Sequence, residues 1–249
     1  MSGHNKWSSI KHKKGAADAK RGKIFTRLVK EIILAARDGG DDLSSNPRLR
    51  TAVQAARNAN MPKDNIDKAI KRGTGEIEGA AYEELTYEGY GQGGVAIMLD
   101  AMTDNKNRTV AEVRHCFSKY GGTMAEGGAV AWNFEQKGLI EIDAAGLDED
   151  EVMMNAIEAG ADDVQNDEEV FSIYTQVADF SKVIVEIEKI GYKINKAELT
   201  RVPKSTVAAD DVAEKLLRLI EKLEDLDDIQ KVYANFEISD ETFEKINLD

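Results

Sequence analysis

The spacing of apolar residues changes near residue 80, and this change divides the chain into two kinds of structure. Residues 22–73 carry apolar side chains at the three- and four-residue spacing of amphipathic helices. After residue 82, short apolar runs typical of strands alternate with further helical patterns. The sequence therefore predicts a multidomain protein of the α and α+β classes, in which an all-helical unit precedes mixed units.

Residues 22–73 are predicted to form three helices packed as a small bundle. The first helix ends at Gly39-Gly40, because glycine commonly follows the last helical turn. The second begins at Asn46-Pro47, where an N-cap residue is followed by proline at the first helical position. The third follows Met61-Pro62 and carries its apolar residues on one face.

The remainder is predicted to hold two ferredoxin-like units, each with the order βαββαβ. One unit occupies a continuous stretch. The other combines two separated stretches: strands over 94–102 and 129–134 around a helix, then a strand near 204–207, a helix and a strand over 229–238. Because these stretches flank the continuous unit, the simplest arrangement inserts one ferredoxin-like domain into the other. A plain tandem of two α+β domains is the alternative.

These patterns predict four segments with the following boundaries. They are a basic N-terminal arm (1–21), a three-helix bundle (22–78), an α+β domain (79–135 plus 203–249) and an inserted α+β domain (136–202). The arm shows no apolar periodicity, so we expect it to be extended, with short helical pieces at most.

Positive charge is concentrated at the start of a chain that is otherwise strongly acidic. Residues 1–75 hold 17 Lys and Arg against 7 Asp and Glu, although the whole chain has a net charge of −13. A net-negative protein is repelled by nucleic acid unless it gathers its cations on one surface. The asymmetry therefore predicts a polyanion partner for the N-terminal part, with a solvated tail as the alternative.

The segment GHNKWSSIKHKK at residues 3–14 mixes cations with an aromatic ring and two imidazoles. Lys and Arg supply phosphate contacts, and Trp7 would either stack on an unpaired base or pack the arm onto the body. His4 and His12 have no third ligand nearby, so no metal site is predicted. The candidate nucleic-acid-binding residues are Lys6, Trp7, Lys11, His12, Lys13, Lys14, Lys20, Arg21, Lys23 and Arg27.

Two later segments are candidates for secondary contacts. YEGYGQGG at residues 87–94 would let the backbone approach a ligand closely, or would simply connect two strands tightly. TDNKNRT at residues 103–109 would cap the helix that follows it, and its arginine could grip a phosphate. The candidate residues are Tyr90, Gly91, Gly93, Gly94, Asn105, Asn107 and Arg108.

No constellation of catalytic residues is evident. His115 and Cys116 are neighbours on a predicted helix and point about 100° apart, so they do not form a nucleophile–base pair. We therefore expect no catalytic residues, cofactor or small-molecule substrate, and an enzyme is only a remote alternative. A single cysteine, the lack of a secretory signal and the lack of a membrane-length apolar run predict a cytoplasmic protein without a membrane partner. A monomer is favoured.

Four long segments resemble the YebC family, whose mitochondrial relative is the translational activator of cytochrome c oxidase subunit I. They are GHNKWSSIKHKKGAADAKRGKIF, NPRLRTAVQAARNANMPKDNIDKAIKRGTGE, YEELTYEGYGQGGVAIM and TDNKNRTVAEVRHCF. The resemblance covers essentially the whole chain and is densest in residues 3–135. It implies an N-terminal helical bundle and two α+β domains. Family members often have Ser where this chain has Asn5 and Pro where it has Gln92, and the stretch Asp41–Ser45 is about one residue longer than common.

The resemblance also implies a function. The family is widely labelled as probable transcriptional regulators that bind DNA, whereas other members associate with the ribosome and ease synthesis of proline-rich stretches. Together with the basic arm, this predicts a non-catalytic regulator of gene expression. Its target is either ribosomal RNA or tRNA, as a translation factor, or promoter DNA, as a transcriptional regulator. The sequence shows no clear recognition helix or dimer seam for a palindromic duplex, which favours RNA.

Overall fold

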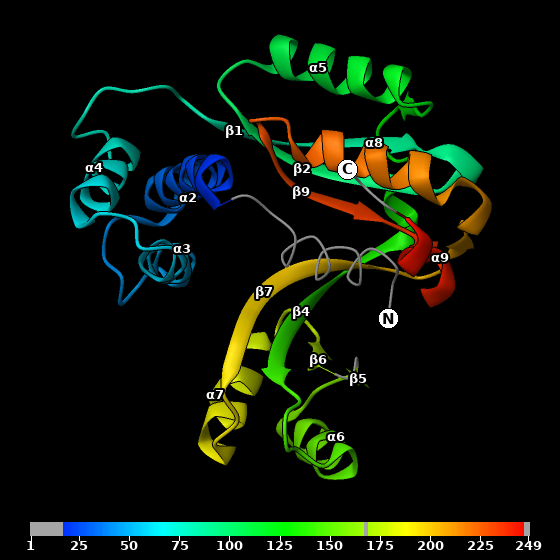
Figure 1. The fold of residues 1–249 in the computed structure, drawn as a ribbon. Helices are drawn as coiled ribbons and strands as arrows, with labels where there is room; N and C mark the ends of the chain where they lie inside the picture. Colours follow the sequence, from blue (N-terminus) through cyan, green and yellow to red (C-terminus); the bar gives the residue numbers. More distant parts are fainter. Residues whose placement is uncertain (1–16, 167–168, 247–249) are drawn as a thin grey trace.

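The computed structural model describes residues 17–166 and 169–246 and shows three lobes (Figure 1). A helical bundle comes first in the chain, and two sheet-containing units follow it. We call these units the first and second sheet domains. The predicted fold class, in which N-terminal helices precede antiparallel-sheet domains, is confirmed.

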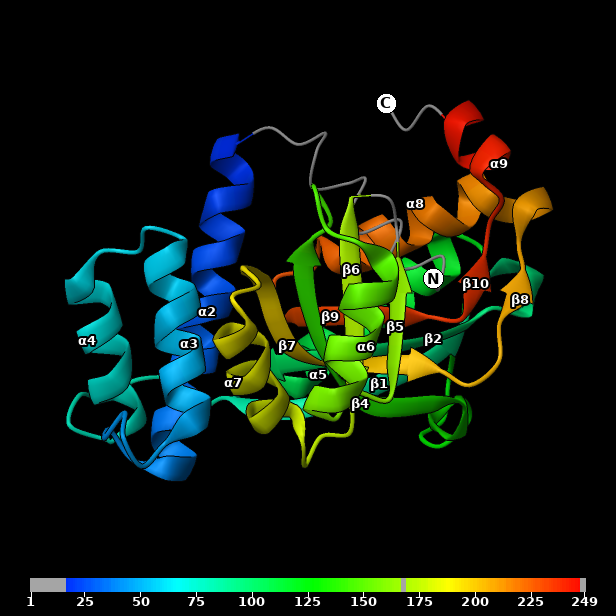
Figure 2. The ribbon, with the colours of Figure 1, turned by 90° about the horizontal axis from the view of Figure 1, so that it is seen from below.

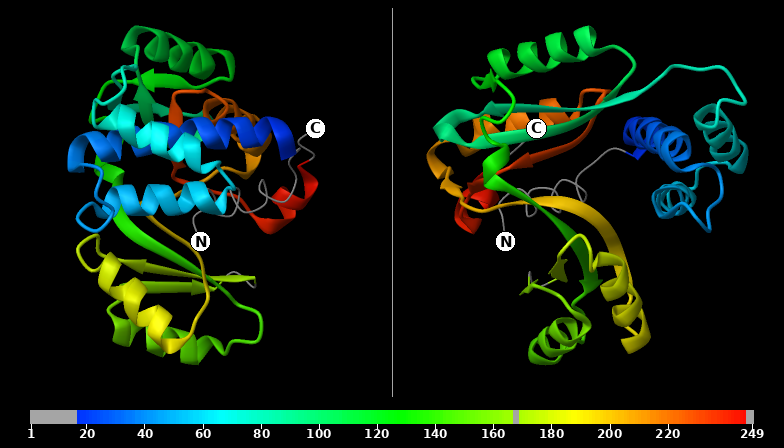
Figure 3. Two further views of the ribbon diagram at one scale, coloured as in Figure 1. Left: turned by 90° about the vertical axis from the view of Figure 1, so that its left-hand side faces the viewer. Right: turned by 180° about the vertical axis from the view of Figure 1, so that it is seen from behind.

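The helical bundle consists of three helices that lie side by side (Figure 3): α2 (Ala17–Gly39), α3 (Pro47–Asn58) and α4 (Lys63–Gly73). Asn46 caps α3 by accepting a hydrogen bond from the Leu49 N–H at 3.0 Å. Its amide nitrogen also donates to the carbonyls of Ala35 and Gly40, which ties the α2–α3 connection to the cap. Apolar side chains of all three helices, Ile32 among them, form the core of the bundle.

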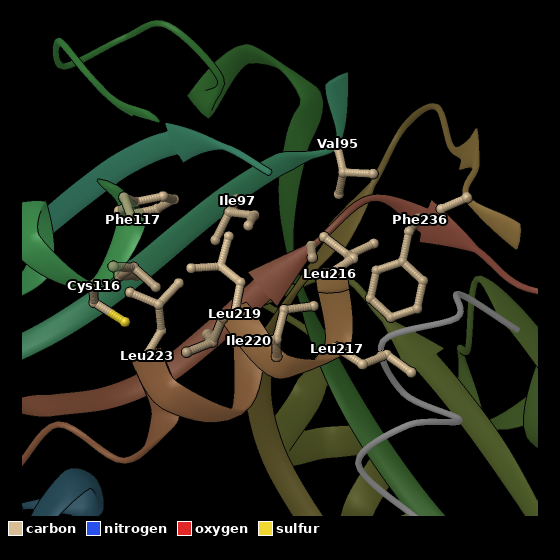
Figure 4. Close-up of a cluster of buried hydrophobic side chains, with 14 of the residues drawn as sticks. Val95, Ile97, Cys116, Phe117, Leu216, Leu217, Leu219, Ile220, Leu223 and Phe236 are labelled. Carbon is tan, nitrogen blue, oxygen red and sulfur yellow. The ribbon is translucent and has the colours of Figure 1, made fainter. Parts of the chain in front are cut away.

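The first sheet domain is built from β1 (Glu83–Tyr90), β2 (Ala96–Thr103), α5 (Lys106–Lys119), β3 (Thr123–Ala125), α8 (Ala213–Glu224) and β9 (Ile229–Ala234). Its strands are antiparallel in the order β3-β1-β2-β9. Helices α5 and α8 cover one face of this sheet, where Phe117, Ile97 and Leu216 are buried (Figure 4). Met98 and Tyr233 are buried on the opposite face. Strand β2 is thus covered on both faces, in agreement with its continuous apolar sequence.

The second sheet domain follows the βαββαβ order: β4 (Phe134–Asp143), α6 (Glu149–Ala159), β5 (Asp163–Asn166), β6 (Val170–Thr175), α7 (Phe180–Ile190) and β7 (Ile194–Pro203). Its antiparallel strands are ordered β5-β6-β4-β7, with α6 and α7 in front of the sheet when the molecule is seen from below (Figure 2). Asp148 caps the start of α6, and Gly160 ends it with a φ of 107°. Strands β4 and β7 pair along their length and connect the two sheet domains (Figure 1).

Several short elements complete the described chain. They are η1 (Gln92–Gly94), η2 (Ala131–Asn133), β8 (Val207–Ala208), η3 (Asp210–Val212), β10 (Phe236–Glu237) and α9 (Asp240–Lys245). Strands β8 and β10 pair in parallel and form a separate two-stranded sheet.

Three local predictions differ from the structure. Helix α2 begins at Ala17 rather than at residue 22, because the single Gly22 costs the helix only about 1 kcal/mol. Residues 129–134 do not form a strand, since hydrogen bonds to Glu88 bend this segment into η2 and β4 begins only at Phe134. The strand near 204–207 does not join the main sheet, because β1 takes that place through a short hairpin with β2.

Candidate nucleic-acid interface

The cations in the middle of α2 face the first sheet domain and are bound there. Lys23 Nζ lies 3.0 Å from the Asp225 carboxylate and 3.0 Å from the carbonyl oxygen of the same residue. Arg27 donates to the carbonyl of Glu224. These acceptors lie at the end of α8, where a helix leaves its last carbonyls without intrahelical partners. Lys23 and Arg27, two residues of the predicted interface, thus tie the helical bundle to the first sheet domain.

Lys30 continues this contact into the protein interior. The residue is only 5% exposed, and its ammonium group donates to the carbonyls of Met102 at 3.1 Å and Asp227 at 2.9 Å. It also donates to the Asp228 carboxylate at 2.7 Å. All three donors of the ammonium are therefore satisfied. Sequence reasoning did not single out Lys30, and the structure identifies it as the buried anchor of the bundle.

Asp228 collects hydrogen bonds from both lobes. Besides Lys30, its carboxylate accepts from Arg108 Nη2 at 2.7 Å, Thr109 Oγ1 at 2.8 Å and Thr103 Oγ1 at 3.1 Å. Burial by itself raises the pKa of the Asp228 carboxyl, but the hydrogen bonds from Lys30, Arg108 and Thr109 outweigh it and lower the pKa to about 2. We call this cluster of five residues the Asp228 junction.

The TDNKNRT segment contributes to this junction. Asn105 caps α5 by accepting a hydrogen bond from the Arg108 N–H at 3.1 Å. The Arg108 guanidinium is shared between Asp104 at 2.8 Å and Asp228. Asn107 is exposed on the first turn of α5. Of the three predicted contact residues in this segment, two therefore have structural partners, and Asn107 faces solvent.

The exposed cations of α3 and α4 have a different environment. We call this set the α3–α4 cation surface; its members are Arg57, Lys63, Lys68, Lys71 and Arg72. Within the described part of the chain, none of them forms an ion pair. The two helices contain only two acidic residues, both on α4. Unpaired cations are available to phosphate groups, which supply most of the affinity in non-specific nucleic-acid binding.

Two other arginines of α3 have partners inside the protein. Arg48 binds Glu31 at 2.7 Å and Glu84 at 2.5 Å. Because Glu84 lies on β1, this ion pair adds a second link between the bundle and the first sheet domain. Arg50 donates to the carbonyl of Leu43 at 3.0 Å. These two arginines therefore serve the fold rather than the α3–α4 cation surface.

The glycine-rich loop between β1 and β2 packs tightly against α8. Gly93 and Gly94 have φ angles of 72° and 76°, in the region that favours glycine. A Cβ atom at Gly91 would lie 2.7 Å from Leu216 Cδ1, so a larger residue would clash. The tight connection between the two strands therefore explains these glycines. Tyr90, at the end of β1, is partly exposed. The pocket beside the loop disfavours an anion, because its lining includes Asp210, Asp211 and Glu214.

An ordered loop over residues 126–133 was missed by sequence reasoning. The Glu88 carboxylate accepts hydrogen bonds from the backbone N–H groups of Gly128 at 2.7 Å, Val130 at 2.6 Å and Ala131 at 2.9 Å. Burial raises the pKa of Glu88, but these three N–H groups outweigh burial and lower it. Trp132 lies at the end of this loop and is exposed.

The remaining predicted residues lie at or before the start of the described structure. Lys20 and Arg21 belong to the first two turns of α2. The contacts predicted for the arm fall outside the described residues, and these are Lys6, Trp7, Lys11, His12, Lys13 and Lys14.

Three further observations concern metal ligands, membrane-length helices and the one cysteine. Within residues 17–166 and 169–246, no group of three or more His, Cys, Asp or Glu side chains is placed to hold a metal ion. No helix among these residues has the length and apolar character needed to cross a membrane. Cys116 is buried, and burial raises the pKa of its thiol to about 11. A thiol with this pKa is a poor nucleophile at neutral pH.

Comparisons with known proteins cover nearly the whole chain. The family model of the TACO1/YebC protein N-terminal domain matches residues 5–76, and that of the TACO1/YebC second and third domain matches residues 82–236. A "probable transcriptional regulatory protein" of Dictyoglomus turgidum is 56% identical over 249 residues, which cover 99% of this chain and 100% of that protein. A protein of the same name from Desulfosudis oleivorans is 55% identical and covers 96% of this chain and 98% of its own length. The crystal structure of a conserved hypothetical protein from Aquifex aeolicus is similar with a TM-score of 0.85 at 51% identity, covering 93% of this chain and 96% of that one.

Proposed function

The chain belongs to the TACO1/YebC family, and from this premise we propose that it is a non-catalytic regulator of gene expression that binds nucleic acid. One observation carries the proposal. The α3–α4 cation surface is exposed and free of ion pairs within the described chain, whereas the cations of α2 that face the first sheet domain are bound to it. The bundle therefore keeps one basic face available to a polyanion, and the basic arm precedes it in the chain.

We assign the phosphate contacts to the α3–α4 cation surface and to the arm. The arm residues are Lys6, Lys11, Lys13, Lys14, Lys20 and Arg21, with Trp7 and His12 stacking on bases or hydrogen-bonding to them. If about six phosphates are neutralised, log affinity falls with log salt at a slope of about −5 on duplex or about −4 on single strands. The acidic sheet domains repel the same polyanion and so direct it towards the basic end.

For the target we propose ribosomal RNA or tRNA, which makes the protein a cytoplasmic, ribosome-associated translation factor. Sequence-specific duplex readers commonly pair two half-sites through a dimer, and this sequence shows no seam for one. We also propose that the protein eases the synthesis of proline-rich stretches, on the basis of the family resemblance.

Promoter DNA is the second candidate, and the names of the relatives favour it. The proteins of Dictyoglomus turgidum and Desulfosudis oleivorans are both named probable transcriptional regulatory proteins. Exposed Lys and Arg side chains also fit the phosphates of a duplex, since phosphate contacts carry no sequence information.

Ribosome sedimentation set beside DNA footprinting tests the proposal. We expect the full chain to sediment with ribosomes, and we expect a variant with Lys11, Lys13 and Lys14 changed to Glu to remain in the light fractions. A matched control makes the same charge change at three exposed lysines of the sheet domains, Lys182, Lys193 and Lys215, and should sediment like the unaltered chain.

The outcomes separate the candidate targets. Protection of promoter DNA without ribosome binding would replace RNA by DNA as the target. Binding to neither, or equal binding by the arm variant and the unaltered chain, would contradict the assigned interface.

A further inference from the structure

The loop between β3 and β4 presents an aromatic ring to solvent. Trp132 is 66% exposed, and its indole N–H donates to the carbonyl of Ala129 at 2.9 Å. Because the one polar group of the ring is satisfied within its own loop, the ring offers its faces to a ligand. Tyr90 of β1 is 38% exposed and donates its hydroxyl to the same carbonyl at 3.0 Å. The shared acceptor brings a second aromatic side chain to the same place.

Hydrogen bonds hold this loop on two sides. On one side, the Glu88 carboxylate is only 6% exposed and accepts the three backbone hydrogen bonds described above. On the other side, Asn133 is buried next to Trp132, and its amide exchanges hydrogen bonds of 3.0 Å with the backbone of Ser205. Binding of a ligand to this ring therefore costs little conformational entropy of the loop.

Lys204 is joined to the segment that carries Trp132 by a backbone hydrogen bond. Its backbone N–H donates to the carbonyl of Asn133 at 2.7 Å, one residue from Trp132. Its side chain is exposed and forms no ion pair with any described residue. Sites for single-stranded nucleic acid combine these features, because bases stack on aromatic faces and lysines contact the phosphates between them.

Few other exposed large apolar side chains of the described residues lie near Trp132 along the chain, which favours a nucleobase over a protein side chain as its ligand. Among the described residues, Trp132 and Tyr90 are the only exposed large apolar side chains that lie between the start of β1 and the start of β4. The others belong to α2, to the segment after α4 and to the second sheet domain. Protein hot spots are normally ringed by further contacts that exclude water. A base needs only the free face of a ring.

We propose that Trp132 and Tyr90 form a stacking site for an unpaired base of a single-stranded nucleic acid, with Lys204 contacting a neighbouring phosphate. We call these three residues the Trp132 platform. The inference rests on the proposed function and extends the interface from the helical bundle to the first sheet domain. It adds a second place of base contact, in the first sheet domain, to the one proposed for Trp7 and His12 of the arm.

Tryptophan fluorescence reports on the platform directly. The chain has two tryptophans, so a Trp7→Phe variant retains Trp132 as its only indole. We expect a twelve-nucleotide single-stranded RNA to quench this emission with the same midpoint that fluorescence anisotropy gives for a labelled copy of the strand. Binding by anisotropy without quenching would overturn the platform and leave the proposed function standing.

Affinity measurements on the full chain separate stacking from charge. Trp132→Ala should bind the RNA roughly 5- to 150-fold more weakly, and should bind an abasic strand of the same length as well as the unaltered chain does. Trp132→Phe retains a stacking face and should recover most of the loss. Met154→Ala is the matched control, because Met154 is 63% exposed on α6, and its affinity should not change.

Each remaining outcome decides the proposal. If Trp132→Ala loses as much affinity for the abasic strand as for the RNA, base stacking is overturned. If Trp132→Ala no longer sediments with ribosomes but binds free RNA with unchanged affinity, Trp132 makes a protein contact and the platform is overturned. If the unaltered chain binds no strand at all, the proposed function and the platform both fail. Equal quenching by the DNA copy of the strand would support a platform that reads bases without regard to the sugar.

Discussion

Two faces of the helical bundle carry cations, and only one of these faces has partners within the described chain. On α2, Lys23, Arg27 and Lys30 bind carbonyl and carboxylate oxygens at the end of α8 and in the loop after it. On α3 and α4, the cation surface is unpaired within the described chain. A count of positive charge along a sequence therefore adds together two roles, attachment to another domain and the binding of an external polyanion that we propose. The tertiary structure separates them by placing the end of α8 against only one of the two faces.

Removal of the buried anchor tests this comparison with the largest expected effect. Lys30→Met should lower the free energy of unfolding by about 3–5 kcal/mol, because it leaves the buried Asp228 carboxylate without its buried ammonium partner. Urea unfolding of the full chain measures this change. Lys63→Met, at an exposed position of the α3–α4 cation surface, should change stability by less than about 0.5 kcal/mol. Equal stability of the two variants would break the comparison.

The pH dependence of stability tests the other half of the same ion pair. The folded pKa of Asp228 is about 2, which is below the ordinary aspartate value of about 3.9. A depressed carboxyl stabilises the fold above its unfolded pKa, and this contribution is lost as the pH falls towards the folded pKa. We expect about 2 kcal/mol of stability to disappear between about pH 5 and pH 2 in the unaltered chain, and this component to be missing in Asp228→Asn. Parallel pH profiles of the two proteins, from urea unfolding at each pH, would contradict this role.

Charge reversal on the other face should change binding rather than stability. A variant with Lys68, Lys71 and Arg72 changed to Glu should bind single-stranded RNA at least about tenfold more weakly and show a salt slope smaller by about 2. Its urea midpoint should stay close to that of the unaltered chain, because these side chains are exposed. Fluorescence anisotropy at several salt concentrations measures both quantities. An unchanged slope would remove the α3–α4 cation surface from the interface.

The smallest effect is expected at the exposed end of the α2 contact. Lys23 and Asp225 are 41% and 44% exposed in their side chains, so this ion pair should contribute less than about 1 kcal/mol. Lys23→Met should therefore lower the urea midpoint slightly and leave the salt slope of RNA binding unchanged. A loss of affinity as large as that of the α3–α4 variant would show that Lys23 exchanges its protein partner for a phosphate.

The parts of the fold that sequence reasoning predicted are those with local signals. Asn46-Pro47 marks the start of α3, and the order of the second sheet domain follows from strands and helices that succeed one another in the chain. The strand order of the first sheet domain does not follow from local signals, because residues 83–90 and 204–207 are both candidates for one position in its sheet. The β1–β2 hairpin decides that competition, and no periodicity in either segment reports it.

The candidate site divides in the same way. The sequence marks basic residues, but it does not reveal that Lys30 meets Asp228, 198 residues later, or that Glu88 organises a loop 40 residues away. Such pairings depend on how the lobes pack against one another. The exposure of Trp132 is not visible in the sequence either, because a single tryptophan forms no periodic pattern. The residues of the arm stay predictions, because they lie outside the described chain.

Strands β4 and β7 have a consequence for how the molecule can be altered. The chain leaves the first sheet domain at Phe134 and returns at Pro203, and these two residues are register partners, about 5 Å apart. Ordinary hairpins close such a gap with two to five residues. We therefore expect that a short turn between Phe134 and Pro203 could replace the second sheet domain while β9 keeps its position beside β2. We expect a chain shortened in this way to keep α8 against the bundle, because the partners of Lys23, Arg27 and Lys30 lie outside the second sheet domain.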